Sequence, residues 1–347
     1  MLVSGTTRSD GVPDVGPADA GYHYPFLSPA PLPISLPRVV FVRASGRDAN
    51  NGLSPGRAFA SIQRALAAVS GDGLIVIGPG LYREQRLLVG VTGRRNSVVV
   101  LFGDEGGRLT GDPTGKVVVD AGGHAAPTVA GPALIDRLTF TGARGPGLRV
   151  LRSAHGVTLR NSTLCGNTGD GVASSGEAVR VVNNMVCGNG GTGVSVRLHG
   201  AREATQLLNN TVAANLQKGI VIRESGAPVP RTLFYNNVVS GNGGTGITAH
   251  AARRMVPAAG SNLNTDGYGA RTPPGSGDMN LAPQFVGDAA SKGIGCEAAD
   301  NLRVAPTSPA IDRGMRTAVE LGLGTRSVTT TGTRDTGPAD LGYHYGQ

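Results

Sequence analysis

The sequence predicts an all-β fold, a right-handed parallel β-helix in which successive coils of the chain stack into a solenoid. Three observations predict it: a repeat between residues 134 and 250, asparagines at matching positions of successive repeats, and 55 glycines in 347 residues. Such a glycine content is about twice that of average globular proteins. It has no three-residue period, so tight turns between short strands explain it better than a collagen helix does.

Four segments of the repeat align directly. They are VTLRNSTLCGNTGDGV from Val157, VRVVNNMVCGNGGTGV from Val179, TQLLNNTVAANLQKGI from Thr205 and TLFYNNVVSGNGGTGI from Thr232, and a weaker copy begins at Leu134. A coil of three short strands, whose edges pair with the coils on either side, explains such a repeat. A leucine-rich repeat would need leucines at fixed short offsets, and these are absent.

Two rows of asparagine are expected to stack along the solenoid, because asparagine tolerates left-handed turns and its amide can bond to neighbouring coils. The first row is Asn161, Asn183, Asn209 and Asn236, and the second is Asn167, Asn189, Asn215 and Asn242. The alternation within strands predicts two columns that face the core. These columns are Leu148, Val172, Val194, Ile220 and Ile247, and Leu159, Val181, Leu207 and Phe234.

Residues 39–82 lie before the coils and predict a short N-terminal capping helix. Phe59, Ile62, Leu66 and Val69 share one helical face, and a first full strand is expected at Leu74–Ile77. Over residues 39–250 the chain resembles bacterial right-handed β-helix repeat proteins of the pectate-lyase-like superfamily. The resemblance implies the fold, whereas activities within that superfamily vary widely.

The end of the chain contains a motif that also occurs near its start. DTGPADLGYHY occupies residues 335–345, and DVGPADAGYHY occupies 14–24. We therefore expect 1–26 to resemble the end of a preceding β-helix unit and 27–38 to be a proline-rich linker. Residues 39–250 would form the coils, and 251–347 a closing segment packed on them. In the alternative, the N-terminal tail pairs with the C-terminal tail of the same unit.

The formal net charge of +8 favours acidic partners, and arginine supplies nearly all of the positive charge. Arginine suits bidentate contacts with carboxylates, sulfates or phosphates, although a general preference for arginine over lysine explains the composition equally well. The chain has no run of 18 apolar residues, so no membrane span is expected. Residues 1–10 lack the apolar core of a signal peptide, so an extracellular or cell-surface location requires an export signal outside this chain.

The candidate binding residues lie four positions after the glycine that begins each third strand. Arg197, Arg223 and His250 should form one outward column, with about 4.8 Å between neighbouring strands. The full set of candidates for binding an acidic glycan is Arg149, Arg152, Arg197, Arg202, Arg223, Arg231 and His250. A solvated charged face is the alternative interpretation.

Lyases of the superfamily need a base and commonly Ca²⁺, which acidic residues stacked on neighbouring coils would hold. Here Asp170 aligns with Thr192, Lys218 and Thr245, so that column has one carboxylate. The outward column that contains Arg160 continues as Val182, Leu208 and Tyr235. We expect the 251–347 tail or a partner to cover this apolar column. No histidine has a second ligand at metal spacing, so no metal or cofactor is expected, and Ca²⁺ only if the protein is a lyase.

Cys165 and Cys187 occupy equivalent positions of adjacent coils, and Cys296 has no obvious mate. We expect either a Cys165–Cys187 disulfide or a stacked pair of thiols. Together these features predict a non-catalytic extracellular or cell-surface module that is structural, adhesive or binds acidic polysaccharide. The alternative is a polysaccharide lyase, or another carbohydrate-active enzyme, for glycans that contain uronate. Nucleic-acid binding is not expected, because no aromatic residues are interleaved with the basic ones.

Overall fold

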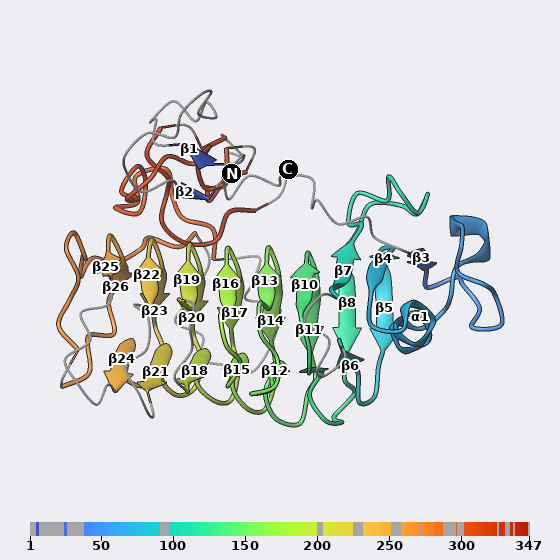
Figure 1. The fold of residues 1–347 in the computed structure, drawn as a ribbon. Coiled ribbons are helices and arrows are strands. Elements are labelled where there is room, and N and C mark those ends of the chain that lie inside the picture. Colours follow the sequence, from blue (N-terminus) through green and yellow to red (C-terminus); the bar gives the residue numbers. More distant parts are fainter. Residues whose placement is uncertain are drawn as a thin grey trace.

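The chain forms a solenoid in which each full coil gives one strand to each of three parallel sheets (Figure 1). The computed structural model describes residues 5–6, 24–25, 38–90, 97–199, 204–224, 232–250, 258–270, 272–286, 296, 302–324, 326–329, 334–335 and 337–345. A separate antiparallel pair joins β1 (Gly5–Thr6) to β2 (Tyr24–Pro25). The predicted all-β parallel β-helix is thus confirmed.

The sheets are named by their place in the coil. Sheet 1 contains β3 (Val39–Val42), β4 (Gly73–Ile77), β7 (Val99–Gly103), β10 (Ala133–Asp136), β13 (Thr158–Arg160), β16 (Arg180–Val182), β19 (Gln206–Leu208), β22 (Leu233–Tyr235) and β25 (Ala258–Gly260). Sheet 2 contains β5 (Gly80–Arg83), β8 (Val117–Asp120), β11 (Thr139–Thr141), β14 (Thr163–Cys165), β17 (Met185–Cys187), β20 (Thr211–Ala213), β23 (Val238–Ser240) and β26 (Leu263–Asn264). Sheet 3 contains β6 (Leu88–Val89), β9 (Thr128–Val129), β12 (Leu148–Val150), β15 (Val172–Ser174), β18 (Val194–Leu198), β21 (Ile220–Glu224) and β24 (Ile247–His250).

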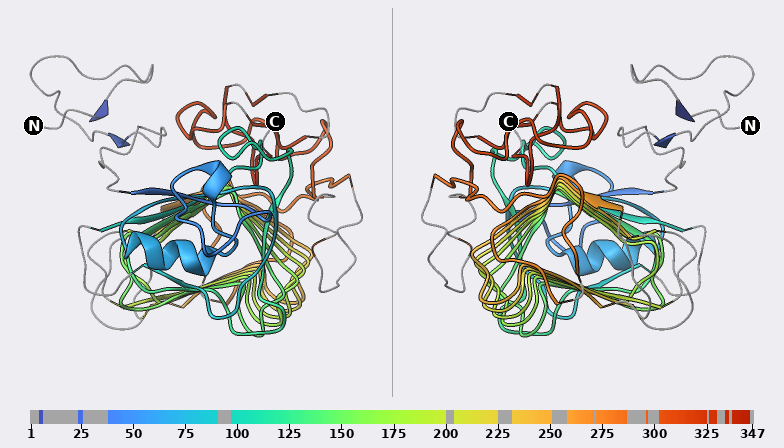
Figure 2. Two further views of the ribbon diagram at one scale, coloured as in Figure 1. Left: turned by 90° about the vertical axis from the view of Figure 1, so that its right-hand side faces the viewer. Right: turned by 90° about the vertical axis from the view of Figure 1, so that its left-hand side faces the viewer.

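The end views show the three sheets arranged around the solenoid axis (Figure 2). Their inward-facing apolar side chains form one buried core cluster. Both predicted inward columns are confirmed. In sheet 3, Leu148 pairs with Val172, and the register continues through Val194 to Ile220 and Ile247. In sheet 1, the column runs from Leu159 to Phe234, and all members of both columns are buried.

The predicted capping helix is α1 (Ile62–Val69), which closes the N-terminal end of the solenoid (Figure 1). The side chain of Ser61 accepts a hydrogen bond from the backbone N–H of Arg64 and so caps the first turn. Ile62, Leu66 and Val69 are buried as expected, whereas Phe59 lies before the helix and bridges to Val42 in an extended segment. Within the described residues, no helix has the length and hydropathy needed to cross a membrane.

Asparagines of the first predicted row make the turn between sheets 1 and 2. Asn161, Asn183, Asn209 and Asn236 all have left-handed backbones, with φ between 52° and 60°. Asn183 Nδ2 donates to Asn161 Oδ1 at 2.8 Å, and Asn236 Nδ2 donates to Asn209 Oδ1 at 3.4 Å. This row is therefore confirmed as a stack along the solenoid.

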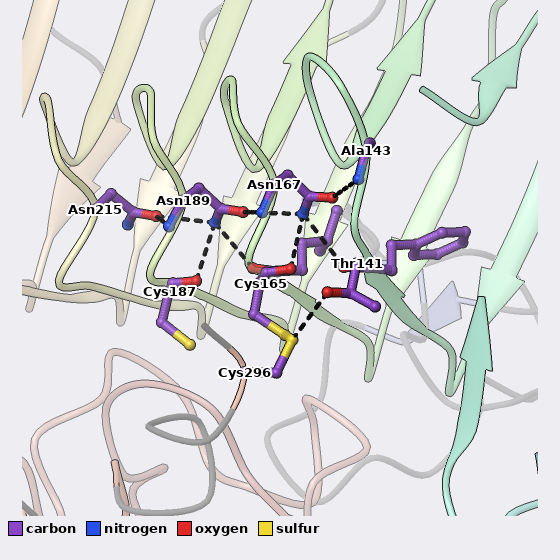
Figure 3. Close-up of a disulfide and its surroundings, with 10 residues drawn as sticks. Thr141, Ala143, Cys165, Asn167, Cys187, Asn189, Asn215 and Cys296 are labelled. Carbon is purple, nitrogen blue, oxygen red and sulfur yellow. Dashed lines mark hydrogen bonds between the residues drawn. A yellow bond between two sulfur atoms is a disulfide. The ribbon is translucent and has the colours of Figure 1, made fainter. Parts of the chain in front are cut away.

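The second predicted row is a buried ladder between sheets 2 and 3 (Figure 3). Asn189 Nδ2 donates to Asn215 Oδ1 at 2.9 Å, and Asn167 Nδ2 donates to Asn189 Oδ1 at the same distance. The ladder ends where Asn242 Nδ2 donates to Asp266 Oδ2 at 2.8 Å. A carboxylate suits the last rung, because it accepts hydrogen bonds but has no amide proton to pass on.

A third ladder follows the first row by one residue and was not predicted. Asn184 Nδ2 donates to Asn210 Oδ1, Asn210 to Asn237 and Asn237 to Asn262, at 3.0 to 3.1 Å. Asn262 Nδ2 then donates to Asp278 Oδ1 at 3.0 Å, so this ladder also ends on a carboxylate. The repeated Asn-Asn pairs thus have divided roles, a left-handed turn residue first and a buried ladder residue second.

The C-terminal segment after β26 returns along the solenoid (Figure 1) and lies over the turns between sheets 1 and 2 of its later coils. Ala318, Leu321, Leu323 and Ala339 of this segment pack on Leu208 and Tyr235 of sheet 1. The apolar outward column is therefore covered by the tail, which was one of the two predicted covers.

Candidate functional site

The predicted cationic column lies on the outer face of sheet 3. Arg197 of β18 pairs with Arg223 of β21, and Arg223 pairs with His250 of β24. All three residues are exposed. Neighbouring strands are about 4.8 Å apart, so the column is a closely spaced row of basic side chains. We call these three residues the strip.

Alternation along the strands places the strip outside. On either side of Arg197, Val196 and Leu198 are buried in the core, and Ile222 precedes Arg223 in the same way. The strip residues therefore point away from the solenoid axis. A one-residue change of register would bury the cations, so the apolar neighbours specify the exposure of the strip.

The other predicted binding residues are only partly gathered at the strip. Arg149 is exposed on β12 but stands in a different column, paired with Ala173 rather than with a strip residue. Arg152 is exposed just after β12. Burial, followed by the charges of Arg152 and Arg197, lowers the pKa of His199. Arg202 and Arg231 lie outside the described residues.

A second charged group stands on sheet 1, beside the part that the tail covers. The outward column contains, in register, Phe102, Asp136 and Arg160 before it becomes apolar at Val182. Arg160 forms a salt bridge with Asp136 at 2.8 Å, and Asn161 Nδ2 donates to Asp136 Oδ1 at 2.7 Å. This buried carboxylate is therefore held by two donors from the next coil.

Arg137, Glu105 and Arg326 extend this group, and we call Glu105, Asp136, Arg137, Arg160 and Arg326 the junction. The Arg137 guanidinium lies over the Phe102 ring, 5.2 Å from its centroid. Its Nε is buried and has no hydrogen-bond partner among the described residues. Arg326 comes from the tail, where its Nη1 donates to the carbonyl of His344 at 3.2 Å.

Burial raises the pKa of Glu105 to about 7, although nearby Arg137 and Arg326 act in the opposite direction. Burial also lowers the pKa of Arg326. The tail residue Tyr343 is in the same electrostatic environment, and burial raises its pKa to about 12. The junction thus combines a carboxyl group that titrates near neutral pH with several guanidinium groups, a combination that can bind an anion or exchange a proton with one.

Sequence reasoning missed the junction, because its members come from four separate segments. Glu105 lies in the loop after β7, where Asp104 Oδ2 accepts hydrogen bonds from the backbone N–H groups of Leu109 and Thr110. Arg326 arrives from the tail, more than two hundred residues later in the chain. Only the Asp136–Arg160 pair was visible in the repeat, since the two residues occupy aligned positions.

The tail motif 335–345 holds the tail on the first row of asparagines, and we call it the clasp. His344 N–H donates to Asn183 Oδ1 at 2.6 Å, and Asn183 Nδ2 donates back to the His344 carbonyl at 3.1 Å. Asn209 Nδ2 donates to the Asp340 carbonyl at 3.1 Å. The backbone N–H of Gly342 donates to the Asn236 carbonyl at 2.8 Å. The clasp therefore spans three successive coils.

Inside the clasp, the His344 ring is buried between a carbonyl and a carboxylate. Its Nδ1 is 3.0 Å from the Gly342 carbonyl oxygen, so Nδ1 must be the donor there, and its Nε2 is 2.7 Å from Asp335 Oδ2. Asp340 lies close by, and burial raises its pKa to about 6. The sequence predicted no second metal ligand near this histidine. In the structure, however, the side-chain atoms of Asp335, Asp340 and His344 that could coordinate a metal ion lie within 4.8 Å of one another. One hydrogen bond already joins His344 to Asp335, and the other ring nitrogen of His344 bonds within the clasp to Gly342.

The cysteine prediction was wrong. Cys165 and Cys187 are paired neighbours on β14 and β17, but the disulfide joins Cys165 to Cys296, with 5.0 Å between their Cα atoms (Figure 3). Cys187 remains a buried thiol. The prediction failed because spacing within the repeat reveals neighbours on one sheet but not a tail residue that crosses over the sheet. The disulfide fastens the tail to sheet 2.

One family model agrees with this geometry. Residues 114–263 match the family model described as a right handed beta helix region. Among solved structures, the chain is similar to the crystal structure of pectate lyase Pel9A, with 15% sequence identity and a TM-score of 0.40, over 89% of this chain and 98% of that chain. A search of curated proteins finds no match.

The coil register and the family match together define the class of protein: this is a right-handed parallel β-helix. The resemblance to right-handed β-helix repeat proteins is thus confirmed, and the matched region covers the coils from just before β8 to β26.

Proposed function

We propose that this protein is an extracellular or cell-surface module that binds acidic polysaccharide along the strip and that has no catalytic role. The observation that carries the proposal is the register of Arg197, Arg223 and His250, which are exposed on consecutive strands of sheet 3. The paired strands hold the backbone of these three residues in place before any ligand arrives, so binding needs no ordering of the backbone. Guanidinium groups can grip carboxylate or sulfate groups in bidentate fashion.

Retention on a column of immobilised polygalacturonate tests this proposal. We expect the wild-type protein to be retained at low ionic strength and the Arg197→Ala/Arg223→Ala variant to elute earlier. The matched control is Arg57→Ala/Arg83→Ala, which removes the same charge from two other exposed positions. Equal elution of the two double variants would show that net charge, not the strip, causes retention.

A second candidate function is that of a polysaccharide lyase or related enzyme on uronate glycans, and the junction favours it. Abstraction of a proton next to a carboxylate needs a base whose pKa is near the working pH and cations that neutralise the carboxylate. Glu105, with a pKa raised to about 7, and Arg137, whose buried Nε has no hydrogen-bond partner among the described residues, have these properties. Ca²⁺ would be the cofactor under this candidate alone.

Incubation with pectate, alginate and glycosaminoglycans, with and without Ca²⁺, separates the two candidates. Under the leading proposal, ultraviolet absorbance from unsaturated sugar products stays at the level of a blank. An increase that the Glu105→Gln variant loses would establish the lyase and overturn the non-catalytic assignment. Glu105→Gln keeps the shape of the side chain, so its loss of activity would report on proton transfer rather than on folding.

A further inference from the structure

Three ionisable side chains of the clasp meet in one buried place. Asp335, Asp340 and His344 are 4%, 7% and 0% exposed, and their potential ligand atoms lie within 4.8 Å of one another. The Asp335–His344 contact is a salt bridge between side chains that are almost inaccessible to water. Arg326 also reaches the clasp, but its Nη1 donates to the His344 carbonyl at 3.2 Å rather than to a carboxylate. Two carboxyl groups and one imidazole therefore lie together where water barely reaches.

The hydrogen bonds of the His344 ring leave one positive centre to be placed between His344 and Asp335. His344 Nδ1 lies 3.0 Å from the Gly342 carbonyl oxygen, which can only accept, so Nδ1 carries a proton. In a neutral ring Nε2 is then an acceptor, and it faces the Asp335 Oδ2 acceptor at 2.7 Å. A proton between these two atoms removes their repulsion. The Nδ1–H bond to a carbonyl also holds Nε2 in the orientation that a metal-binding histidine needs.

Asp340 supplies a further ligand and a charge that the shared proton does not balance. Its Oδ1 accepts a hydrogen bond from the backbone N–H of Asp312 at 2.8 Å, which is the one hydrogen bond of this carboxylate among the described residues. Its Oδ2 is therefore open, although the residue is buried. Two carboxylates at −1 each and one imidazolium at +1 give the three side chains a formal charge of −1. A divalent cation and a neutral ring bring that sum to zero, which burial favours.

We propose that Asp335, Asp340 and His344 bind a divalent transition-metal ion, for which Zn²⁺ is the best fit, and that this ion locks the clasp onto the solenoid. One imidazole nitrogen and two carboxylate oxygens are ligands that Zn²⁺ takes in proteins, and a water molecule can complete the four. Ca²⁺ fits less well, because it takes six to eight oxygen ligands. The ion displaces the shared proton, which passes to water.

The side chains need only small movements to receive the ion. Tetrahedral ligands with bonds of about 2.0–2.2 Å stand about 3.4 Å apart, so His344 Nε2 and Asp335 Oδ2 must separate slightly from their 2.7 Å contact. The terminal torsion of an aspartate has a broad energy well, so rotation of the two carboxyl groups can make this change.

The ligand residues also dock the clasp, through their backbone atoms. The His344 N–H donates to Asn183 Oδ1, and the His344 carbonyl accepts from Asn183 Nδ2. The Asp340 carbonyl accepts from Asn209 Nδ2. These bonds do not use the ligand side chains, but an ion that joins Asp335 to His344 restrains the backbone between them. Metal binding should therefore stabilise the docked tail, because the site exists only in the folded state.

Titration of the full-length, chelator-treated protein with ZnCl₂ in a calorimeter tests the site. We expect the wild type to bind one Zn²⁺ per chain. Asp340→Asn keeps an acceptor for the Asp312 N–H but loses the charge, and should bind Zn²⁺ at least about tenfold more weakly, since even changes behind the ligands cost that much. The matched control is Asp312→Asn, which removes an exposed carboxylate from the same tail and should bind like the wild type. CaCl₂ should bind at least about tenfold more weakly than ZnCl₂.

Thermal unfolding measures the lock. Zn²⁺ should raise the unfolding temperature of the wild type and of Asp312→Asn, and EDTA should reverse the rise, whereas Asp340→Asn should respond to neither. Circular dichroism of Asp340→Asn without metal checks that its coils are intact.

Co²⁺ gives a readout that needs no variant. A four-coordinate Co²⁺ ion absorbs visible light far more strongly than the aqueous ion, and Zn²⁺ should abolish this absorption by displacing it from the wild type. The proposal is overturned if the wild type does not bind Zn²⁺, if Asp340→Asn binds it as tightly as Asp312→Asn does, or if Ca²⁺ binds as tightly as Zn²⁺. A Co²⁺ spectrum that stays that of the aqueous ion would overturn it as well.

Discussion

Asparagine has two different roles in this protein, and the backbone conformation separates them. Asn161, Asn183, Asn209 and Asn236 adopt the left-handed conformation, which asparagine tolerates better than most residues with a side chain. Asn189 and its neighbours instead satisfy buried backbone carbonyls while they bond to each other. A buried amide with all its partners stabilises the stack, whereas loss of the amide leaves those partners unsatisfied.

Replacement of a ladder asparagine should therefore be costly. We expect Asn189→Ala to lower the free energy of unfolding by about 2–4 kcal/mol, because the carbonyls of Leu164 and Cys187 each lose a donor and the ladder is interrupted. The matched control is Gln217→Ala, because the Gln217 amide is exposed in a neighbouring turn. This change should alter the free energy of unfolding by no more than about 0.5 kcal/mol. Urea denaturation monitored by circular dichroism measures both, and equal effects would contradict a structural role for the ladder.

The raised pKa of Glu105 predicts that the stability of the protein depends on pH. Its pKa is about 7 in the folded protein and near 4.5 when unfolded, so the folded state binds the proton more tightly. The contribution of this group to stability is therefore present below pH 4.5 and is lost as the pH rises to 7. Glu105→Gln should remove this decline and be more stable than the wild type above pH 7, by on the order of 2 kcal/mol.

Thermal unfolding of both proteins between pH 4 and pH 8 measures the difference. Burial also raises the pKa of Asp340 to about 6, so this group too lowers the stability as the pH rises. Both proteins contain Asp340, so its effect cancels in the comparison. Parallel curves for the wild type and Glu105→Gln would show that Glu105 is not in a desolvated environment.

At the scale of elements, the tail is fastened to the solenoid by different interactions at three places. Apolar residues cover Leu208 and Tyr235 on sheet 1, the clasp holds the asparagine turns, and the disulfide ties Cys296 to sheet 2. The first two are local to the turn between sheets 1 and 2. Only the disulfide is covalent, so we expect it to contribute more than the other two contacts to the stability of the docked tail.

Cys296→Ser tests the contribution of the disulfide. The bond closes a loop with a sequence separation of 131 residues, for which the chain-entropy model gives about 4–5 kcal/mol. We expect the variant to unfold at a lower temperature than the wild type and to be insensitive to dithiothreitol, whereas the wild type should lose stability when the reductant is added. Cys187→Ser should lose stability on addition of dithiothreitol as the wild type does, because Cys187 is a thiol that takes no part in the disulfide. If dithiothreitol left the unfolding temperature of the wild type unchanged, this result would contradict the presence of the Cys165–Cys296 disulfide.

Elements also differ in how well the sequence predicted them. Repeats, inward columns and asparagine rows were predictable, since they depend on local alternation and on the stacking of equivalent positions. Cys296, Arg326 and Glu105 were not, because each reaches its place through a contact between segments that share no repeat. The Cys165–Cys187 expectation failed for the same reason: the correct stacking of neighbours does not exclude a third cysteine from the tail.

At the scale of the whole molecule, the solenoid separates two charged surfaces. The strip lies on sheet 3, and the junction lies on sheet 1 beside the tail. The strip was predicted down to its register, because alternation places Arg197 and Arg223 outside as soon as Val196 and Ile222 are assigned to the core. Glycan binding by these cations depends on the charge spacing of the glycan and on the salt concentration.

The salt dependence of glycan binding tests the strip most directly. The affinity of the protein for a defined oligogalacturonate, measured by calorimetry over a series of sodium chloride concentrations, should fall steeply for the wild type, since exposed ion pairs are screened. In Arg197→Ala/Arg223→Ala the affinity should be low and the slope clearly shallower, whereas Arg57→Ala/Arg83→Ala should retain the wild-type slope. Identical slopes and affinities for the two double variants would contradict the assignment of glycan binding to sheet 3.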